Sequence, residues 1–467
     1  MTNSNEQFIG KTASQTAFKV GPESASAAND HNSIWVGDSA KAGHPVTPVW
    51  LDNDRLKLHA LIVDPDPAGY GRHALLDQIV SQQVARGGAV VIFDSEFHSE
   101  IGSLLQVSLQ RFARDFGRSS DVRSVDPFAP RLSHTYNMFF DSSAEAAAEK
   151  ALSLIPSAGN SPGAEYYRQQ AAYAIKVIAG ALNQASIAYT PVDLAMFLMQ
   201  EDAIDALRHE ARDRYPDSRE TAALENWLDA SHGKENSPRH LKEICGGMSG
   251  RLYMIGQGRL GRVFNTYRPE VTMRDVLDNR RLAVFQLPTG GMFDLSTLLR
   301  KMILIDFRRA VLERERPNES VPPLVIFNGK DMLGAEVGGV LTDLRIGGVS
   351  AWVAASSVAD ADERILANTW TKFVFNLAGS QEHQHLIPFA DEGFKPTQFD
   401  SLHERECALL NPTDTDWVVS VPKVARDDMP RHEFFGHVDA GEDIHTGQEE
   451  GASRFFRSFF LRDGQPG

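Results

Sequence analysis

The sequence contains few of the features that would assign it to a secreted, zinc-bound or membrane class. Its 467 residues include only two cysteines, Cys245 and Cys407, which lie far apart and match no zinc or disulfide spacing. No apolar run approaches the ~20 residues that a bilayer-crossing helix needs, and the N-terminus has no signal-peptide pattern. We therefore expect a soluble, cytoplasmic protein with reduced cysteines and no direct membrane insertion.

Positive charge is also in deficit. Lys and Arg number 47 against 62 Asp and Glu, which gives a formal net charge of −15. Such a balance argues against a surface that coats nucleic acid, although a ring assembly could hold a local basic patch in its channel. Composition therefore does not indicate DNA as a partner and does not exclude it. With 42% hydrophobic and 23% charged residues, the chain is typical of a globular protein of two to three domains.

The stretch LIVDPDPAGYGRHALL, residues 61–76, has the frame of a phosphate-binding loop without its chemistry. In the motif G-x-x-x-x-G-K-[ST], a strand leads into a loop whose backbone N–H groups wrap a phosphate, and a helix follows. The eight corresponding positions are Asp66, Pro67, Ala68, Gly69, Tyr70, Gly71, Arg72 and His73. The second glycine is present, but an aspartate, an arginine and a histidine replace the first glycine, the lysine and the hydroxyl.

Carboxylates in this loop would repel a polyphosphate. One unpaired contact at ~4 Å costs ~4 kcal/mol at an effective dielectric constant near 20, and Asp64 adds a second carboxylate beside Asp66. Two interpretations are open on this stretch alone: an ordinary strand–turn–helix, or a phosphate loop that has lost its binding residues. We expect Asp64 or Asp66 to pair with Arg72, because arginine forms two-pronged bonds with carboxylates.

The pattern of periodicity divides the chain into five parts. Residues 1–45 predict an N-terminal arm, and residues 426–467 predict a C-terminal tail. Strand-like and helix-like segments alternate over 46–158 and again over 266–425, as in a parallel sheet built from βαβ units. Residues 159–265 read as helical nearly throughout. The sequence therefore predicts an α/β fold interrupted by an inserted all-α domain.

An ordered set of stretches over about residues 46–425 resembles the TraG/TraD/VirD4 family of type IV coupling proteins. These stretches are ARGGAVVIFD, SHTYNMFF, LSLIPSAGNSPGAEYYRQQA, GRLGRVFNT, LLRKMILIDFRRAV and ILANTWTKFVFNL. The resemblance implies a RecA-like sheet of the P-loop NTPase type with an inserted all-α domain. It also implies a hexameric ATPase that recruits DNA or protein substrates to conjugation and type IV secretion machines. Family members usually carry N-terminal transmembrane helices, and this sequence shows none.

The sequence departs from the family at each position that would serve phosphoryl transfer. In LVIFNGKDM, Asn328 and Gly329 stand where the family has the Mg²⁺-orienting aspartate and the catalytic glutamate. In VAASS, Ser356 stands where a glutamine would sense the γ-phosphate. The alternative is that Asp331, three residues after Asn328 in LVIFNGKDM, has taken over the catalytic role. A later N-T-x-T-K element, thought to shape the ring, is retained as Asn368, Thr369, Thr371 and Lys372.

These substitutions favour a decayed nucleotide site, with no catalytic residues, no cofactor and no metal. We expect a pseudo-ATPase that acts as an adaptor, recruitment or regulatory component of a conjugative or type IV secretion system. Its expected partners are a genuine coupling protein, a relaxase or an effector, in a homo- or hetero-oligomer at the inner-membrane machinery. The alternative is an unconventional translocation motor that uses ATP and Mg²⁺ through a variant P-loop.

The tail segment SRFFRSFFLRD carries a candidate partner-binding face. Phe455, Phe456, Phe459 and Phe460 recur at the one- and four-residue offsets of a helix face, and arginines flank them. This face could dock on the chain's own core or on a partner, and the sequence leaves both open.

Overall fold

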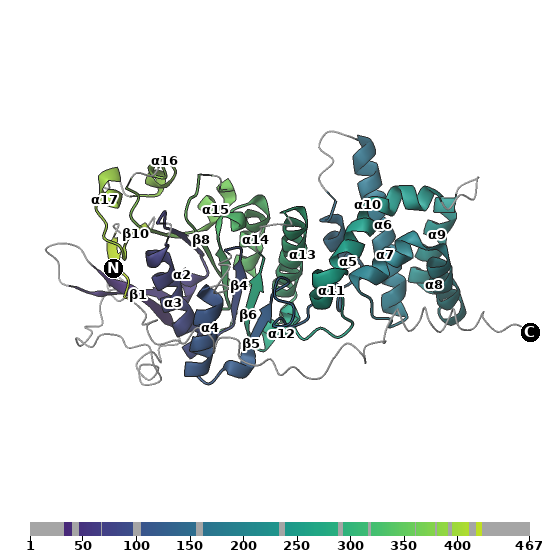
Figure 1. Cartoon of the computed structure of the whole chain (residues 1–467), viewed down its shortest axis with the longest axis horizontal. Helices are drawn as coiled ribbons and strands as arrows, with labels where there is room; N and C mark the ends of the chain where they lie inside the picture. Colours follow the sequence, from purple (N-terminus) through teal and green to yellow (C-terminus); the bar gives the residue numbers. More distant parts are fainter. Residues whose placement is uncertain are drawn as a thin grey trace, which may run out of the picture. The chain divides into compact units, whose positions relative to one another are not determined.

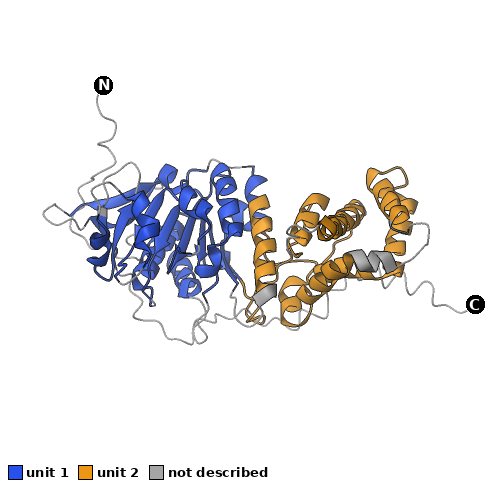
Figure 2. Cartoon of the chain, turned by 90° about the horizontal axis from the view of Figure 1, so that it is seen from above, with its two compact units in different colours: residues 1–124, 274–289, 310–436 blue, residues 125–273, 290–309, 437–467 orange. Residues whose placement is uncertain are grey.

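A computed structural model describes most of the chain outside its two ends. The described residues are 32–39, 46–66, 68–96, 104–155, 162–232, 239–287, 293–315, 319–359, 361–378, 381–390, 395–410 and 417–422. The chain forms two compact units: unit 1 comprises residues 1–124, 274–289 and 310–436, and unit 2 comprises 125–273, 290–309 and 437–467 (Figure 2). The predicted domain boundaries at residues 158, 265 and 425 stay a prediction. The two compact units follow contacts within the fold and do not show which segment is inserted into which domain.

Unit 1 is built on a mixed sheet with the strand order β2-β1-β11-β10-β9-β3-β8-β7-β4-β6-β5 (Figure 1). The strands are β1 Ser33–Ser39, β2 Pro48–Asp52, β3 Ala60–Val63, β4 Val90–Asp94, β5 Val122–Val125, β6 Leu282–Gln286, β7 Leu324–Asn328, β8 Ser350–Ala355, β9 Thr371–Val374, β10 Glu406–Leu410 and β11 Trp417–Ser420. Strands β9, β3, β8, β7, β4 and β6 pair in parallel. The predicted α/β fold with a parallel sheet is therefore confirmed.

The central strands are continuous apolar runs because helices cover both faces of a parallel sheet. Every residue of β3, β4, β7 and β8 is buried. On one face, Phe93 lies between Phe285 and Phe327, with ring centroids 5.3 and 5.5 Å away. The other face carries Ile62 and Ile92 in the same core as helices α3 (Tyr70–Ala85) and α4 (Leu104–Asp115).

An antiparallel extension of the sheet was not predicted. Strand β1 pairs antiparallel with β2 and β11, although it lies in the stretch expected to form an arm. Its apolar core, Ile34–Val36, is only three residues long, which is a weak strand signal. The side chain of Gln82 on α3 also holds β1 in place. It accepts a hydrogen bond from Trp35 N (3.0 Å) and donates one to Trp35 O (2.7 Å).

Further helices of unit 1 surround this sheet. They are α2 Asn53–Leu56, α14 Ala335–Ile346, α15 Glu363–Asn368, α16 His383–Leu386 and α17 Pro396–Asp400. Helix α12 (Met273–Asp278) and helix α13 (Phe293–Leu312) each contain residues of both units.

Unit 2 is helical, as its sequence pattern predicted. Its helices are α5 Ala144–Leu152, α6 Pro162–Gln184, α7 Pro191–Met199, α8 Glu201–Arg214, α9 Arg219–His232, α10 Arg239–Ile255 and α11 Gly258–Phe264 (Figure 1). Helix α7 begins with a capping box in which Thr190 and Asp193 bond each other's backbone N–H groups, with Pro191 in the first turn. Among the helices that the structure describes, none has the length and apolarity to cross a membrane.

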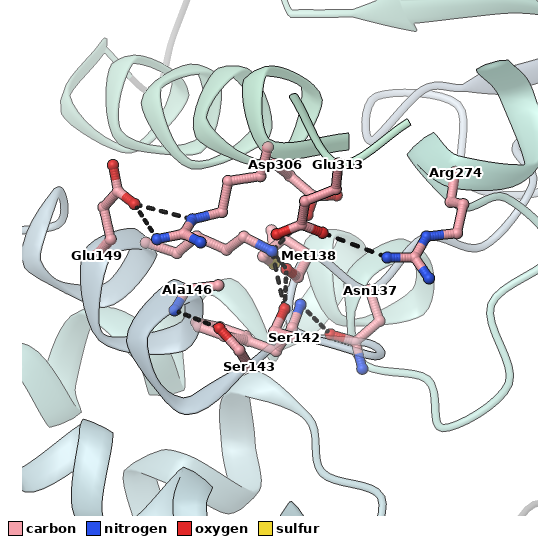
Figure 3. Close-up of polar contacts among 12 residues, drawn as sticks. Asn137, Met138, Ser142, Ser143, Ala146, Glu149, Arg274, Asp306 and Glu313 are labelled. Carbon is pink, nitrogen blue, oxygen red and sulfur yellow. Dashed lines mark hydrogen bonds and ion pairs between the residues drawn. The ribbon is translucent and has the colours of Figure 1, made fainter. Parts of the chain in front are cut away.

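A buried polar cluster fastens α5 to α13 within unit 2. Lys150 Nζ donates hydrogen bonds to Met138 O (2.6 Å) and Ser142 Oγ (2.8 Å) and forms an ion pair with Asp306 (Figure 3). The hydroxyl of Tyr136 donates to the other oxygen of Asp306. Each of the three ammonium hydrogens of Lys150 thus has an acceptor, which is what a buried charge requires.

Candidate functional site

The candidate site lies at the edge of the unit 1 sheet where the parallel strands end. Ligands of open α/β sheets bind at this edge, outside the carboxyl ends of the strands. Asp64 follows β3, Asp94 ends β4, Asn328 ends β7 and Ser356 follows β8. The fold therefore brings the loop after β3 and the end of β7 to the same edge of the sheet.

The loop after β3 uses its own carboxylates to satisfy its backbone. Asp64 Oδ2 accepts a hydrogen bond from Arg72 N (2.8 Å), and Asp64 Oδ1 accepts one from Asp66 N (3.2 Å). Asp66 Oδ1 accepts from Ala68 N (3.1 Å), and its carbonyl accepts from Gly69 N (2.8 Å). In a phosphate loop such N–H groups face the ligand, whereas here protein oxygens already occupy them.

Asp64 is buried at the base of this loop. Burial raises the pKa of its carboxyl, and the hydrogen bonds from Arg72 N and Asp66 N oppose that rise. The Asp64 carboxyl group is therefore a hydrogen-bond acceptor held in place at the base of the loop by two backbone N–H groups.

The two glycines of the loop are explained by packing. Gly69 has a φ of 59° and precedes α3, and a Cβ there would lie 2.8 Å from Arg72 Nη2, so the guanidinium lies against the loop at this point. A Cβ on Gly71 would lie 2.3 Å from the ring of Phe375. Gly71 is thus required by the close approach of Phe375, whether or not the loop binds a ligand. His73 is also buried, and its backbone N–H donates to Gly69 O (2.9 Å).

The side chain of Arg72 pairs with Glu96, so the predicted pairing with Asp64 or Asp66 is wrong. Arg72 Nη1 lies 2.8 Å from Glu96 Oε1, and Nη2 donates to Oε2 at 3.1 Å. Asp64 contacts Arg72 only through the backbone N–H. The sequence reasoning missed Glu96, although a glutamate two residues past the end of a buried parallel strand was a usable signal.

Asn328 connects the ends of β7 and β4. Its Nδ2 donates to Asp94 Oδ1 (2.9 Å) and lies 3.3 Å from Glu96 Oε2. The backbone N–H of Glu96 also donates to Asp94 Oδ1 (2.9 Å). An amide at position 328 can donate these bonds, whereas an ionised carboxylate could not.

Gly329 leaves little room for a side chain. Its φ is 103°, a backbone conformation that residues other than glycine rarely adopt. A Cβ at this position would lie 2.3 Å from Ser95 Oγ. Position 329 is therefore fixed as glycine by the local packing.

The remaining predicted residues lie on elements other than those that carry Arg72, Glu96 and Asn328, or outside the described part of the chain. Ser356 is exposed, and Asp331 lies in the short turn Lys330–Met332. Lys372 lies near the start of β9, at the opposite edge of the sheet, where Nζ donates to Thr369 O (2.6 Å) and lies 3.9 Å from the Phe389 ring centroid. Burial lowers the pKa of Lys372 to about 8. Phe455, Phe456, Phe459 and Phe460 lie outside the described residues.

No metal site emerges from the part of the chain that the structure describes. There, no three His, Cys, Asp or Glu side chains are grouped as metal ligands. The site thus consists of one arginine, an amide and several carboxylates.

Solved structures share this architecture. TrwB in complex with the ATP analogue ADPNP aligns over 91% of this chain and 99% of its own, with 13% identity and a TM-score of 0.56. The chain has the fold of the plasmid coupling protein TrwB. The ADP–Mg²⁺ complex of TrwB aligns over 83% of this chain and 89% of its own, with 13% identity and a TM-score of 0.56. The GDPNP complex aligns over 82% and 90%, with 15% identity and a TM-score of 0.54.

At this identity the likeness to TrwB establishes the fold alone. No protein-family model and no curated protein matches the chain. The expected likeness to the coupling proteins is thus confirmed at the level of the RecA-like fold.

Proposed function

We propose that this chain is a nucleotide-independent counterpart of the coupling proteins, acting as an adaptor or recruitment component of a conjugative or type IV secretion system. The TrwB fold supports the setting, since those structures are described as a bacterial conjugative coupling protein. The observation that carries the proposal is the occupation of the loop N–H groups by Asp64 and Asp66.

The magnitudes favour exclusion of nucleotide. A polyphosphate entering the loop would have to displace Asp64 from two N–H groups and would face the carboxylates of Asp66 and Asp94, while Glu96 already occupies Arg72. Each close repulsive contact costs ~4 kcal/mol at an effective dielectric constant near 20. Micromolar binding is worth only about 8 kcal/mol in total, so two such contacts offset it.

Hydrolysis would lack its chemical groups even if nucleotide entered. Phosphoryl transfer depends on positioning and on charge stabilisation by Mg²⁺ and basic groups. Asn328 Nδ2 points its hydrogens at Asp94 and Glu96, and Gly329 has no space for a side chain. Neither position can hold Mg²⁺ through a carboxylate or polarise an attacking water.

The proposal is tested by hydrolysis and by partner capture on the full chain. Purified protein should release phosphate from Mg-ATP no faster than a blank, with or without single-stranded DNA. Tagged protein should co-purify with the coupling protein or relaxase of its host, and removal of ATP should not release them. Turnover that disappears in Arg72→Ala would overturn the proposal and favour a motor with a variant P-loop, because Arg72 would then replace the usual lysine.

A further inference from the structure

Three N–H donors converge on one carboxylate at the site edge. Arg72 Nη1 and Nη2 lie 2.8 and 3.1 Å from the two oxygens of Glu96, and Asn328 Nδ2 lies 3.3 Å from Oε2. The guanidinium and the amide are both buried, with Arg72 4% and Asn328 1% exposed. An arginine fork with an adjacent amide is a good arrangement for binding a carboxylate or phosphate.

Both donors also lie beside groups other than Glu96. The guanidinium lies against Gly69, where a Cβ would be 2.8 Å from Nη2. The Asn328 amide is fixed by its bond to Asp94 Oδ1 (2.9 Å). The Asn328 amide should keep its place when Glu96 is lost, because its bond to Asp94 does not depend on the Glu96 side chain.

The same place holds polar atoms that Glu96 does not satisfy. Arg72 Nε, Arg72 Nη1 and Asn328 Oδ1 are buried and have no hydrogen-bond partner among the described residues, although Nη1 lies within ion-pair distance of Glu96. Buried polar atoms in that state call for an explanation, and a bound water or ion is one.

We propose that Arg72 and Asn328 form an oxyanion site whose resident occupant is the carboxylate of Glu96. Glu96 therefore excludes soluble oxyanions by occupying their place as a tethered competitor. The inference rests on the proposed function, because it names the residue that keeps the edge closed to anionic ligands.

The chemistry predicts which ligands fit the opened site. Glu96→Ala removes a CH₂–COO⁻ group, which has nearly the size and shape of acetate. Inorganic phosphate offers the same pair of oxygens to the fork but is larger and more highly charged. The neighbouring Asp94 carboxylate repels both anions, so we expect binding in the millimolar range.

The test compares the melting temperature of variants in sodium chloride, acetate and phosphate at equal ionic strength. Glu96→Ala should melt ~2–4 °C higher in saturating acetate or phosphate than in chloride, since a ligand that binds only the folded state raises its stability. The parent protein should show no difference. The double variant Arg72→Met, Glu96→Ala should also show none, because the fork is absent.

Glu149→Ala is the matched control. Glu149 accepts two hydrogen bonds from Arg309, but the side chains of that pair are 35% and 28% exposed. Its removal leaves two partly exposed arginines, Arg308 and Arg309, so neither anion should raise the melting temperature. An equal shift in this control or in the double variant would overturn the proposal by showing a general salt effect.

If Glu96→Ala does not fold in chloride, the same melting measurements are made on Glu96→Gln. Glutamine has the shape of glutamate and keeps one acceptor oxygen, but it carries no charge. Recovery of folded Glu96→Ala in acetate or phosphate alone would support the proposal. If neither variant responds to either anion, the proposal is wrong. That failure differs from failure of the proposed function, which would appear as Mg-ATP binding or hydrolysis by the parent protein.

Discussion

At the scale of single residues, backbone geometry decides what the site can hold. Gly71 and Gly329 cannot accept a Cβ without meeting Phe375 and Ser95, respectively. The departures of the loop from the P-loop motif could be recognised from the sequence, because the eight positions are contiguous in the chain. The partner of Arg72 could not, because Glu96 is 24 residues away and reaches it only through the fold.

A second residue-scale feature, the buried His59, predicts a pH dependence. Ala351 N donates to His59 Nδ1 (3.1 Å), and His59 Nε2 lies 2.7 Å from Leu341 O, an arrangement that fits the neutral ring. Burial lowers the pKa of His59 from 6.5 to about 4. Between these values the unfolded chain binds more protons, so the free energy of unfolding should fall as the pH falls from 6.5 towards 4.

The size of this effect can be measured by denaturant titration at pH 7.5 and pH 5. The parent protein should lose about 2 kcal/mol more than His59→Asn over this range. Asparagine is the appropriate variant because position 59 has a φ of 66°, which asparagine tolerates better than most residues. Equal losses in both proteins would show that His59 does not titrate in this range.

At the scale of elements, the Lys150 cluster connects α5 to α13 within unit 2 (Figure 3). Replacing Lys150 by methionine should lower the free energy of unfolding by about 3 kcal/mol, because Asp306, whose side chain is 17% exposed, would keep its charge without the ammonium group. Chemical denaturation measures this loss. Glu149→Ala, which breaks a more exposed pair with Arg308 and Arg309, should cost at most about 1 kcal/mol. Similar losses in the two variants would contradict the assignment.

The same scale shows which elements a sequence can predict. Strands β4 and β7 were evident because both their faces are buried, so they are continuous apolar runs. Strand β1 was missed because it joins the sheet at a site set by Gln82 and by pairing with β11, which is distant in sequence. Long-range pairing of this kind has no local signal.

At the scale of the whole molecule, the chain shares the fold of TrwB, and carboxylates of the chain itself bond the backbone of the loop after β3. The chain aligns with TrwB over 91% of its length at 13% identity. Core strands need only apolar residues at the right spacing, whereas a nucleotide site needs particular groups at particular positions. The order of segments was therefore enough to predict the fold, and the altered loop was enough to question the activity.

We propose that the protein's own carboxylates exclude nucleotide from the loop after β3. Calorimetric titration of the full chain with Mg-ATP measures this exclusion. We expect no saturable heat up to millimolar Mg-ATP, and therefore no rise in melting temperature from ligand binding. Saturable binding with a Kd below about 100 μM, about −5.5 kcal/mol, that is lost in Arg72→Ala would contradict the account.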